Sequence, residues 1–219
     1  MREGRKGGTR GMTAGCEPGQ VERTPRVDGE ARRSAAWLVR PAGRILAMSR
    51  LTRERIEEAF DALNGELSRR GTKAEVFVVG GAVLCLVLDA RTSTKDVDAW
   101  FVPAPEVREA ARAVAGSLDL PEDWLNDAAK AFLPAGAGFE RWREWSHLEV
   151  SVTNEETLLA MKCAASRTAE DAADIRFLAE RLGLRSSQAV LDVVLAFYPP
   201  ERLPVRTRLL LEEMLDGRP

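Results

Sequence analysis

The spacing of apolar residues changes along the chain and predicts helices and strands in alternation. From residue 51 to 70, apolar residues recur every three or four positions, which predicts a helix that ends at Gly71. The apolar, β-branched run at 75–79 predicts a buried strand, and the apolar residues at 82–88 predict a tightly packed helix. A second strand is predicted over 97–102, where two following prolines stop it.

The rest of the chain is predicted to be mainly helical, with one more strand. Helices are expected over 106–118 and from 121 to about 133, followed by a loop at 134–138 and a strand within 143–153 centred on HLEVSV. Further helices are expected over 155–165, 169–182, 187–197 and 206–215. These elements predict an α/β (α+β) protein with a core over 49–153 and a helical C-terminal region over 154–219.

Residues 1–48 differ in composition from the rest of the chain. They carry ten Arg and Lys against five acids, a net charge of +5, so the remainder carries −7 of the total of −2. One interpretation is a basic arm that touches nucleic acid. The other is a disordered tail, produced by an upstream start with Met48 as the native first residue. We favour the tail, because its few apolar residues cannot offset the entropy cost of ordering it.

Composition excludes several classes of protein. A hydrophobic content of 45% over 219 residues is ordinary for a globular protein. The three cysteines form no CxxC pair, and the one histidine, His147, cannot make a histidine-rich metal site. No apolar run approaches the ~18 residues of a membrane-spanning helix, and the N-terminus lacks the apolar segment of a secretory signal. We therefore expect a soluble, cytoplasmic protein.

A glycine pair, Gly80 and Gly81, lies between the first predicted strand and the helix after it. Glycine lets the backbone approach a phosphate closely, and a helix N-terminus offers unpaired N–H groups and a positive dipole. The alternative is a tight strand-to-helix turn with no ligand. The pair is neither a P-loop nor a GxGxxG fingerprint, so alone it is weak evidence for a phosphate site.

Two aspartates, Asp96 and Asp98, begin the second predicted strand two positions apart. Their side chains therefore point to the same face of the sheet. Like charges this close repel unless a cation lies between them, and hard oxygen ligands suit Mg²⁺ or Mn²⁺. The alternative is a solvated strand end with two surface acids. Because the glycine pair lies shortly upstream, we favour the metal site.

The loop before the second strand offers two more candidates for nucleotide binding. Arg91 would steady a phosphate or an acid of the site, and Thr94 would hydrogen-bond within the loop. A third candidate is Lys162, which follows apolar residues in a predicted helix, so its ammonium group can reach a cleft and a triphosphate. A structural pair between Lys162 and Asp171 or Asp174 is the alternative, and the sequence does not separate the two.

A third carboxylate is predicted on the strand centred on HLEVSV. If that strand lies beside the strand of Asp96, Glu149 can bind the metal and help to deprotonate an attacking hydroxyl. A solvent-facing glutamate on an edge strand is an equally good interpretation.

These residues resemble a known family. The segment VVGGAVLCLVLDARTSTKDVDAW resembles the core motif of the DNA polymerase beta-like nucleotidyltransferase superfamily, with its glycine pair, helix and acid-x-acid strand. The segment LEVSVTNEETLLAMKCAASRTAEDAADIRFL is similar to the second half of small prokaryotic members related to AbiEii-type toxins, in which a lysine helix leads to an arginine and paired aspartates. The resemblance covers roughly residues 76–182.

The resemblance implies a mixed β-sheet flanked by helices, with a helical C-terminal part. It implies Mg²⁺- or Mn²⁺-dependent transfer of a nucleoside monophosphate from an NTP to a hydroxyl of RNA, protein or a small molecule. It also implies that the chain is a toxin with an antitoxin protein as partner. By carry-over, Gly80 and Gly81 hold phosphates, Asp96 and Asp98 are catalytic metal ligands, and Glu149 is the third catalytic acid.

The chain departs from the family pattern at one position of the motif. Ala82 follows the glycine pair, where many members have a serine that holds phosphate. The third acid rests on one strand pattern and on no diagnostic motif. The alternative function is therefore a catalytically inactive nucleotidyltransferase-fold module that binds nucleotide, RNA or a partner protein.

Overall fold

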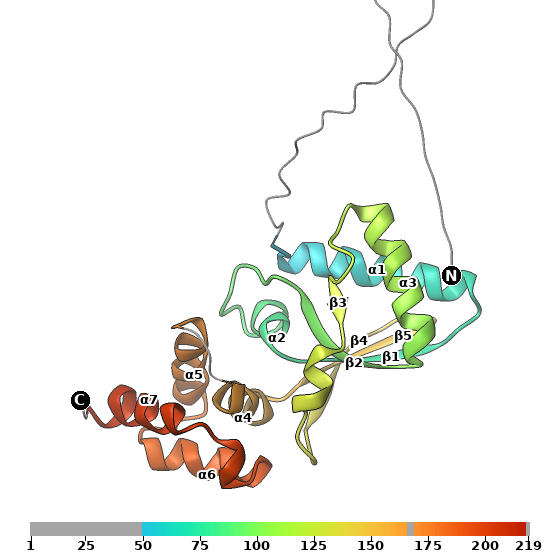
Figure 1. Cartoon of the computed structure of the whole chain (residues 1–219). Coiled ribbons are helices and arrows are strands. Elements are labelled where there is room, and N and C mark those ends of the chain that lie inside the picture. The colour runs from blue at the N-terminus through green and yellow to red at the C-terminus, as the bar shows by residue number, and fades with distance from the viewer. Residues whose placement is uncertain (1–49, 166–168, 218–219) are drawn as a thin grey trace, which may run out of the picture. The chain divides into compact units, whose positions relative to one another are not determined.

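The structure is a computed structural model that describes residues 50–165 and 169–217. The predictions for residues 1–48 therefore lie outside the described residues. Figure 1 shows the elements in their arrangement. In chain order they are α1 (Arg53–Arg69), β1 (Ala74–Val78), α2 (Gly81–Leu86), β2 (Val97–Val102), α3 (Ala104–Leu118), β3 (Leu125–Asn126), the 3₁₀ helix η1 (Ala128–Phe132), β4 (Phe139–Glu144), β5 (Leu148–Thr153), α4 (Glu155–Ala165), α5 (Ala169–Arg181), α6 (Ser187–Phe197), the 3₁₀ helix η2 (Pro200–Arg202) and α7 (Val205–Asp216).

The five strands form one mixed sheet in the order β3-β2-β1-β5-β4. Strand β1 pairs antiparallel with β2 and parallel with β5, while β4 pairs antiparallel with β5 and β3 pairs parallel with β2. Helices precede, interrupt and follow these strands. The predicted fold class, an α/β (α+β) protein with a mixed sheet flanked by helices, is confirmed.

The two faces of the sheet differ in their side chains. Val76 and Ala99 are fully buried and share a face with Phe101, whose ring contacts Arg108 of α3. Figure 1 shows α1 and α3 together on one side of the sheet. On the other face, Phe77 and Trp100 are half-buried and stack with ring centroids 4.9 Å apart. Because side chains alternate along a strand, Asp98 shares this second face with Trp100. The aspartates therefore belong to the face that α1 and α3 leave uncovered.

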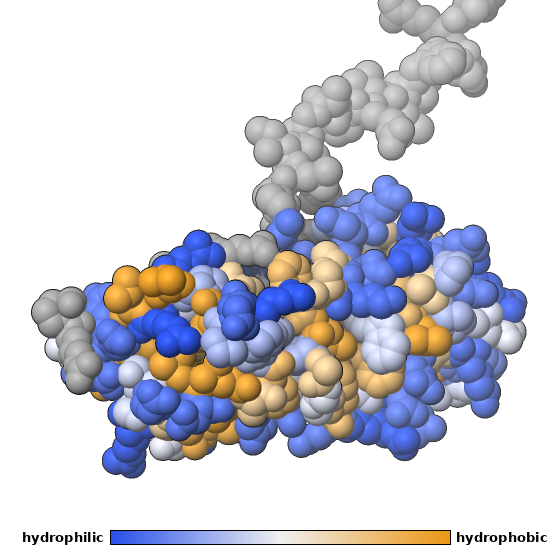
Figure 2. Space-filling model, turned by 60° about the horizontal axis from the view of Figure 1, so that its bottom comes forward, coloured by the Kyte–Doolittle hydropathy of each residue, from blue (hydrophilic) through white to orange (hydrophobic). Residues whose placement is uncertain are grey.

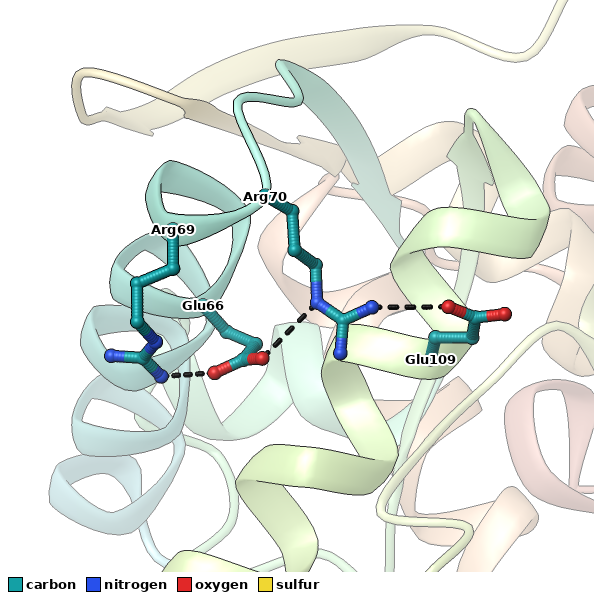
Figure 3. Close-up of polar contacts among 4 residues, drawn as sticks. All are labelled: Glu66, Arg69, Arg70 and Glu109. Atoms are coloured by element: carbon teal, nitrogen blue, oxygen red, sulfur yellow. Dashed lines mark hydrogen bonds and ion pairs between the residues drawn. The ribbon is translucent and has the colours of Figure 1, made fainter.

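Helices α1 and α3 are also joined at the surface (Figure 3). The carboxylate of Glu66 accepts hydrogen bonds from Arg69 and, at 3.1 Å, from Arg70 Nε. The same Arg70 side chain donates through Nη1 to Glu109 of α3 at 3.0 Å. Exposed ion pairs of this kind stabilise a protein little, so the packing of α1 on α3 depends on their buried apolar residues.

The C-terminal helices pack on one another, α4 against α5 and α6, and α6 against α7. Their apolar residues, among them Leu158, Ile175 and Leu211, are fully buried and belong to the same core cluster as the sheet. A buried hydrogen bond of 3.0 Å from Thr207 Oγ1 to the Cys163 carbonyl joins α7 to α4. Among the described residues, no helix is long and apolar enough to cross a membrane.

The predicted helix from residue 121 to 133 is wrong. Residues 125–126 instead pair with β2 as β3, and only the short η1 follows. Two bonds to the surrounding structure compete with a helix here, because the Trp124 carbonyl accepts from Val97 N at 2.7 Å and Trp124 Nε1 donates to the Ala111 carbonyl at 3.0 Å. Strand β4 was not predicted, since four of its six residues are exposed and its pattern is not apolar.

Candidate functional site

A cavity of about 270 Å³ lies where β1 and β2 meet the C-terminal helices. The β1–α2 turn, β2, η1, α4 and α5 contribute to its walls. Its lining residues are Val79, Gly80, Gly81, Asp98, Ala128, Ala129, Phe132, Leu158, Met161, Lys162, Ala165 and Asp171. Four of the residues singled out in the sequence therefore line one cavity: the glycine pair, one of the two aspartates and the lysine.

Asp96 and Asp98 lie side by side with a third polar residue on the neighbouring strand. Strand β3 pairs parallel with β2, and its Asn126 is opposite Asp98. The Asn126 side chain donates through Nδ2 to Asp96 Oδ2 at 3.3 Å. From the sequence, Asn126 was a residue that could line a cleft but was given no role in the site, because a two-residue strand leaves no periodic signal.

The electrostatics of the aspartate pair are unfavourable for two negative charges. Burial raises the pKa of Asp98, and the charge of Asp96 raises it further, whereas the Asn126 amide and Lys162 lower it. Burial likewise raises the pKa of Asp96. Within residues 50–165 and 169–217, neither carboxylate forms an ion pair with a lysine or arginine. A cation bound between the two carboxylates would relieve this repulsion.

The glycine pair fits closely against the side chains of the site. Gly80 has a φ of +69°, and a Cβ there would lie 3.2 Å from Asp98 Oδ2. A Cβ on Gly81 would lie 2.9 Å from Thr94 Oγ1 and 3.8 Å from Arg91 Nη1. Both positions therefore need glycine for packing alone. Helix α2 has only six residues, so its dipole adds little to a phosphate site here.

Thr94 and Arg91 hold the loop between α2 and β2. Thr94 is buried, and its backbone N and O bond to Leu51 at 2.9 and 2.7 Å. Arg91 donates to both carboxylate oxygens of Asp174, at 2.9 Å from Nε and 2.7 Å from Nη2. Both residues thus lie beside Gly81, while the Arg91 guanidinium donates to an aspartate of α5.

Lys162 lines the cavity and is also paired. Its Nζ lies 2.8 Å from Asp174 Oδ2 and 3.1 Å from Asp171 Oδ1. The structural pair that was one of the two interpretations of the sequence is therefore present. It is compatible with the other interpretation, because the ammonium group and Asp98 border the same cavity.

Glu149 lies away from the aspartates, so the expected third carboxylate is not where the sequence analysis put it. The expectation required its strand to lie beside the strand that follows Asp96, but β1 separates β5 from β2. On β5, Glu149 is opposite Glu75, and Val152 is opposite Val78. Glu149 is on the same face of the sheet as Asp98. It lies four residues, or about 13 Å along the strand, before the β5 residue that is level with Asp98. It accepts a 3.1 Å bond from Arg141 Nε at the far end of the sheet.

The β5 residue nearest to the row of Asp98 is Thr153. It is buried, and its hydroxyl donates to the Gly138 carbonyl at 3.2 Å. In the part of the chain that the structure describes, no group of three or more His, Cys, Asp or Glu side chains could hold a metal ion. The side chains of the site that offer oxygen ligands together are therefore the aspartate pair and the nearby Asn126.

Comparisons with protein-family models, with curated proteins and with solved structures found no match for this chain. The interpretation of the site therefore depends on its geometry and on the resemblance of its motifs. That geometry joins a close-packed glycine pair, two carboxylates without an ion-pair partner among the described residues, and a lysine across a small cavity.

Proposed function

We propose that the chain is a metal-dependent nucleotidyltransferase, which binds an NTP in this cavity and transfers its nucleoside monophosphate to a hydroxyl of RNA, protein or a small molecule. The hydroxyl oxygen bonds to the α-phosphorus, the bond to the β-phosphate breaks, and pyrophosphate leaves. One observation carries the proposal. Asp96, directly before β2, and Asp98, on β2, are partly withdrawn from water, their pKa values are raised, and no basic side chain of the described residues pairs with them. Such a pair is expensive for the folded protein unless a ligand compensates it.

The donor set suits Mg²⁺ or Mn²⁺ bound together with a nucleotide. Mg²⁺ in nucleotide sites usually takes one or two carboxylates, and water and phosphate oxygens complete its shell. Asp96 and Asp98 would hold the ion, with the Asn126 amide beside them. When bound, the ion would supply charge neutralisation at the phosphates and polarise the phosphorus under attack.

The opposite wall of the cavity offers positive charge for a triphosphate. Lys162 is within reach of two aspartates at 2.8 and 3.1 Å, so its flexible stem can turn the ammonium group toward a phosphate without leaving Asp174. The cavity, at about 270 Å³, is at the small end of ligand pockets, which suits the phosphates and the ribose. Phe132 lines the cavity with 43% of its surface exposed, so it would contact the base.

The attacking hydroxyl must lose its proton to a base. Four aspartates lie at or beside the cavity. Asp171 and Asp174 are already paired with Lys162, which leaves Asp96 and Asp98. We assign proton transfer to Asp96 or Asp98, because neither carboxylate forms an ion pair with a basic side chain of the described residues.

A second candidate function is favoured by a specific observation. Thr153 occupies the position on β5 where a third carboxylate would complete the pair, and it is bonded to Gly138. A site with two carboxylates and no third can bind nucleotide and metal without catalysing the transfer. The alternative is therefore a catalytically inactive module that binds nucleotide, RNA or a partner protein in the same cavity.

Calorimetric titration tests the binding step. The full chain is titrated with ATP, GTP, CTP and UTP, with and without Mg²⁺, beside Asp96→Asn/Asp98→Asn and the matched control Glu149→Gln. We expect Mg²⁺-dependent binding of at least one NTP, lost in the double variant and kept in the control. Absence of binding for all four nucleotides would reject the transferase, and of the inactive module it would leave only the forms that bind RNA or a partner protein.

Turnover separates the two candidates. Incorporation of labelled nucleotide into total RNA, total protein and small hydroxyl acceptors is compared for the wild type and the Asp96→Asn/Asp98→Asn variant. Incorporation that only the wild type supports identifies the transferase, and binding without incorporation identifies the inactive module. The implied toxin role adds one further expectation, that expression of the wild type arrests bacterial growth and expression of the double variant does not.

A further inference from the structure

The last helix, α7, presents an apolar strip to solvent. Val205 and Leu209 are 74% and 61% exposed, more than any other large apolar residue of the described chain. They are four residues apart and so lie one above the other on the same side of the helix. Thr207 and Leu211 bury the opposite side against the protein. Figure 2 shows apolar side chains among hydrophilic ones at the end of the molecule that carries the C-terminal helices, on the left of the view.

Charged residues flank this strip in an unusual order. Arg206 and Arg208 lie in the first half of α7, and Glu212 and Glu213 in the second half, so its first turn has no acid and its last turn no base. The helix dipole favours the reverse arrangement. In the residues that the structure describes, none of these four side chains forms an ion pair. The order of charges thus costs local stability and finds no compensation within the described chain.

We propose that α7 pairs with α7 of a second copy of this chain, in an antiparallel arrangement about a two-fold axis near Leu209. Two-fold symmetry makes the same surface meet itself, which requires self-complementary charges. In an antiparallel pair, the residues on one side of the apolar strip meet the partner's residues on that same side of its strip. Arg206 then lies opposite Glu213 of the partner subunit, and Arg208 lies opposite Glu212 of the partner subunit.

The antiparallel direction is the one that the charges select. Symmetry repeats both ion pairs, and Leu209 packs near its own counterpart at the centre of the contact. A parallel pair would set arginine against arginine and glutamate against glutamate, which is repulsive. The partner's charges also supply what the dipole lacks, acids at the first half of α7 and bases at the second.

The size of the contact sets the expected affinity. A helix of 12 residues is about 18 Å long, so one helix pair buries less than the roughly 800 Å² per partner of a standard interface. The dimer should therefore be weak and dissociate on dilution. It should also weaken at high salt, since its ion pairs lie at the rim.

Sedimentation velocity of the full chain tests the proposal. Between about 1 and 200 µM, the mass should rise from that of the 24.1 kDa chain toward twice that value. Leu209→Gln should weaken association at least tenfold. Arg206→Glu/Arg208→Glu makes the exposed face acidic, and Glu212→Arg/Glu213→Arg makes it basic. Each charge variant should stay monomeric alone, and an equimolar mixture of the two should dimerise.

Several outcomes would overturn the proposal. A wild-type chain that stays monomeric at the highest concentration has no such interface. A dimer that all three variants leave unchanged uses another surface. If the charge variants dimerise neither alone nor in the mixture, and circular dichroism shows that both are folded, the antiparallel pairing is ruled out. The result is independent of nucleotide binding, because α7 does not line the proposed nucleotide cavity.

Discussion

Two pairs of aspartates each contribute one side chain to the cavity, Asp98 and Asp171, and the pairs differ in their partners. Asp171 and Asp174 of α5 are matched by cations: Asp174 is buried and accepts two bonds from Arg91 and one contact from Lys162. Asp96 and Asp98 have no such match among the described residues, and burial raises the pKa of both. The pair on α5 is thus neutralised by the fold, and the pair on β2 is left with its charge.

This difference shows which acids are structural and which are candidates for a ligand. Burial alone does not separate them, because Asp174 is more buried than Asp98. What separates them is whether the protein itself supplies the positive charge. The Arg91–Asp174–Lys162 network also joins the loop before β2 to α4 and α5, so it holds the two walls of the cavity together.

The largest effect is expected from the neutralised pair. Asp174→Ala would leave Arg91 and Lys162 partly buried without their shared carboxylate, and breaking a buried pair in this way costs about 3 kcal/mol. Urea unfolding measures the loss. The matched control is Glu144→Ala, which breaks an exposed pair with Arg141 and should change the free energy of unfolding by less than about 0.5 kcal/mol. Equal effects for the two variants would contradict the distinction.

A smaller loss is expected from crowding the other pair. Gly80→Ala adds a Cβ 3.2 Å from Asp98 Oδ2 in a backbone conformation with φ of +69°. Strain and displacement of Asp98 should together cost about 2 kcal/mol. The control is Gly116→Ala on the exposed side of α3, where a Cβ meets open space and should stabilise the helix by about 0.5–1 kcal/mol. A neutral Gly80→Ala would mean that Asp98 has room to spare.

Much of the fold was predictable because its apolar patterns are strong. The strand Val97–Val102 and the helices Glu155–Ala165 and Ser187–Phe197 have the predicted bounds. Their buried positions repeat with the period of their element, and that repeat is what a sequence displays. The same patterns predicted that the glycine pair and Asp98 lie close together, because the glycine pair follows one strand and Asp98 is on the next.

The missed features depend on contacts between distant segments. Strand β3 exists because residues 125–126 pair with β2, and β4 is an exposed edge with little apolar signal. The position of Glu149 depends on the register of β5 against β1, which no local pattern sets. The ion pairs of Lys162 depend on how α5 packs against α4, so the sequence left both of its interpretations open.

Removing one charge of the β2 pair should stabilise the protein, the opposite sign from Asp174→Ala. The pKa of Asp98 is raised in the folded state, so the folded chain binds this proton more tightly than the unfolded chain. Its ionised form therefore costs stability above the folded pKa, and the cost disappears as the pH falls below the unfolded value. Asp98→Asn should gain about 1 kcal/mol at pH 8, and the gain should shrink toward pH 4.

Thermal unfolding of the wild type and Asp98→Asn across this pH range checks the sign. One kcal/mol corresponds to about 2–4 °C in Tm for a chain of this size. The same variant should lose Mg²⁺-dependent nucleotide binding, so stability and binding move in opposite directions. If the variant instead loses stability at every pH, Asp98 has a structural role like that of the aspartates of α5.

The smallest effect is expected at the far end of the uncovered face. Glu149 shares the face of Asp98 but is offset from it by about 13 Å along the strand direction, with β1 between them, and its partner Arg141 is 60% exposed. Glu149→Gln should therefore change the free energy of unfolding by less than about 0.5 kcal/mol and leave nucleotide affinity unchanged. A fivefold or greater loss of Mg²⁺-dependent binding would show that β5 shifts to bring this carboxylate to the aspartates. The two-carboxylate site would then be the resting form of a three-carboxylate one.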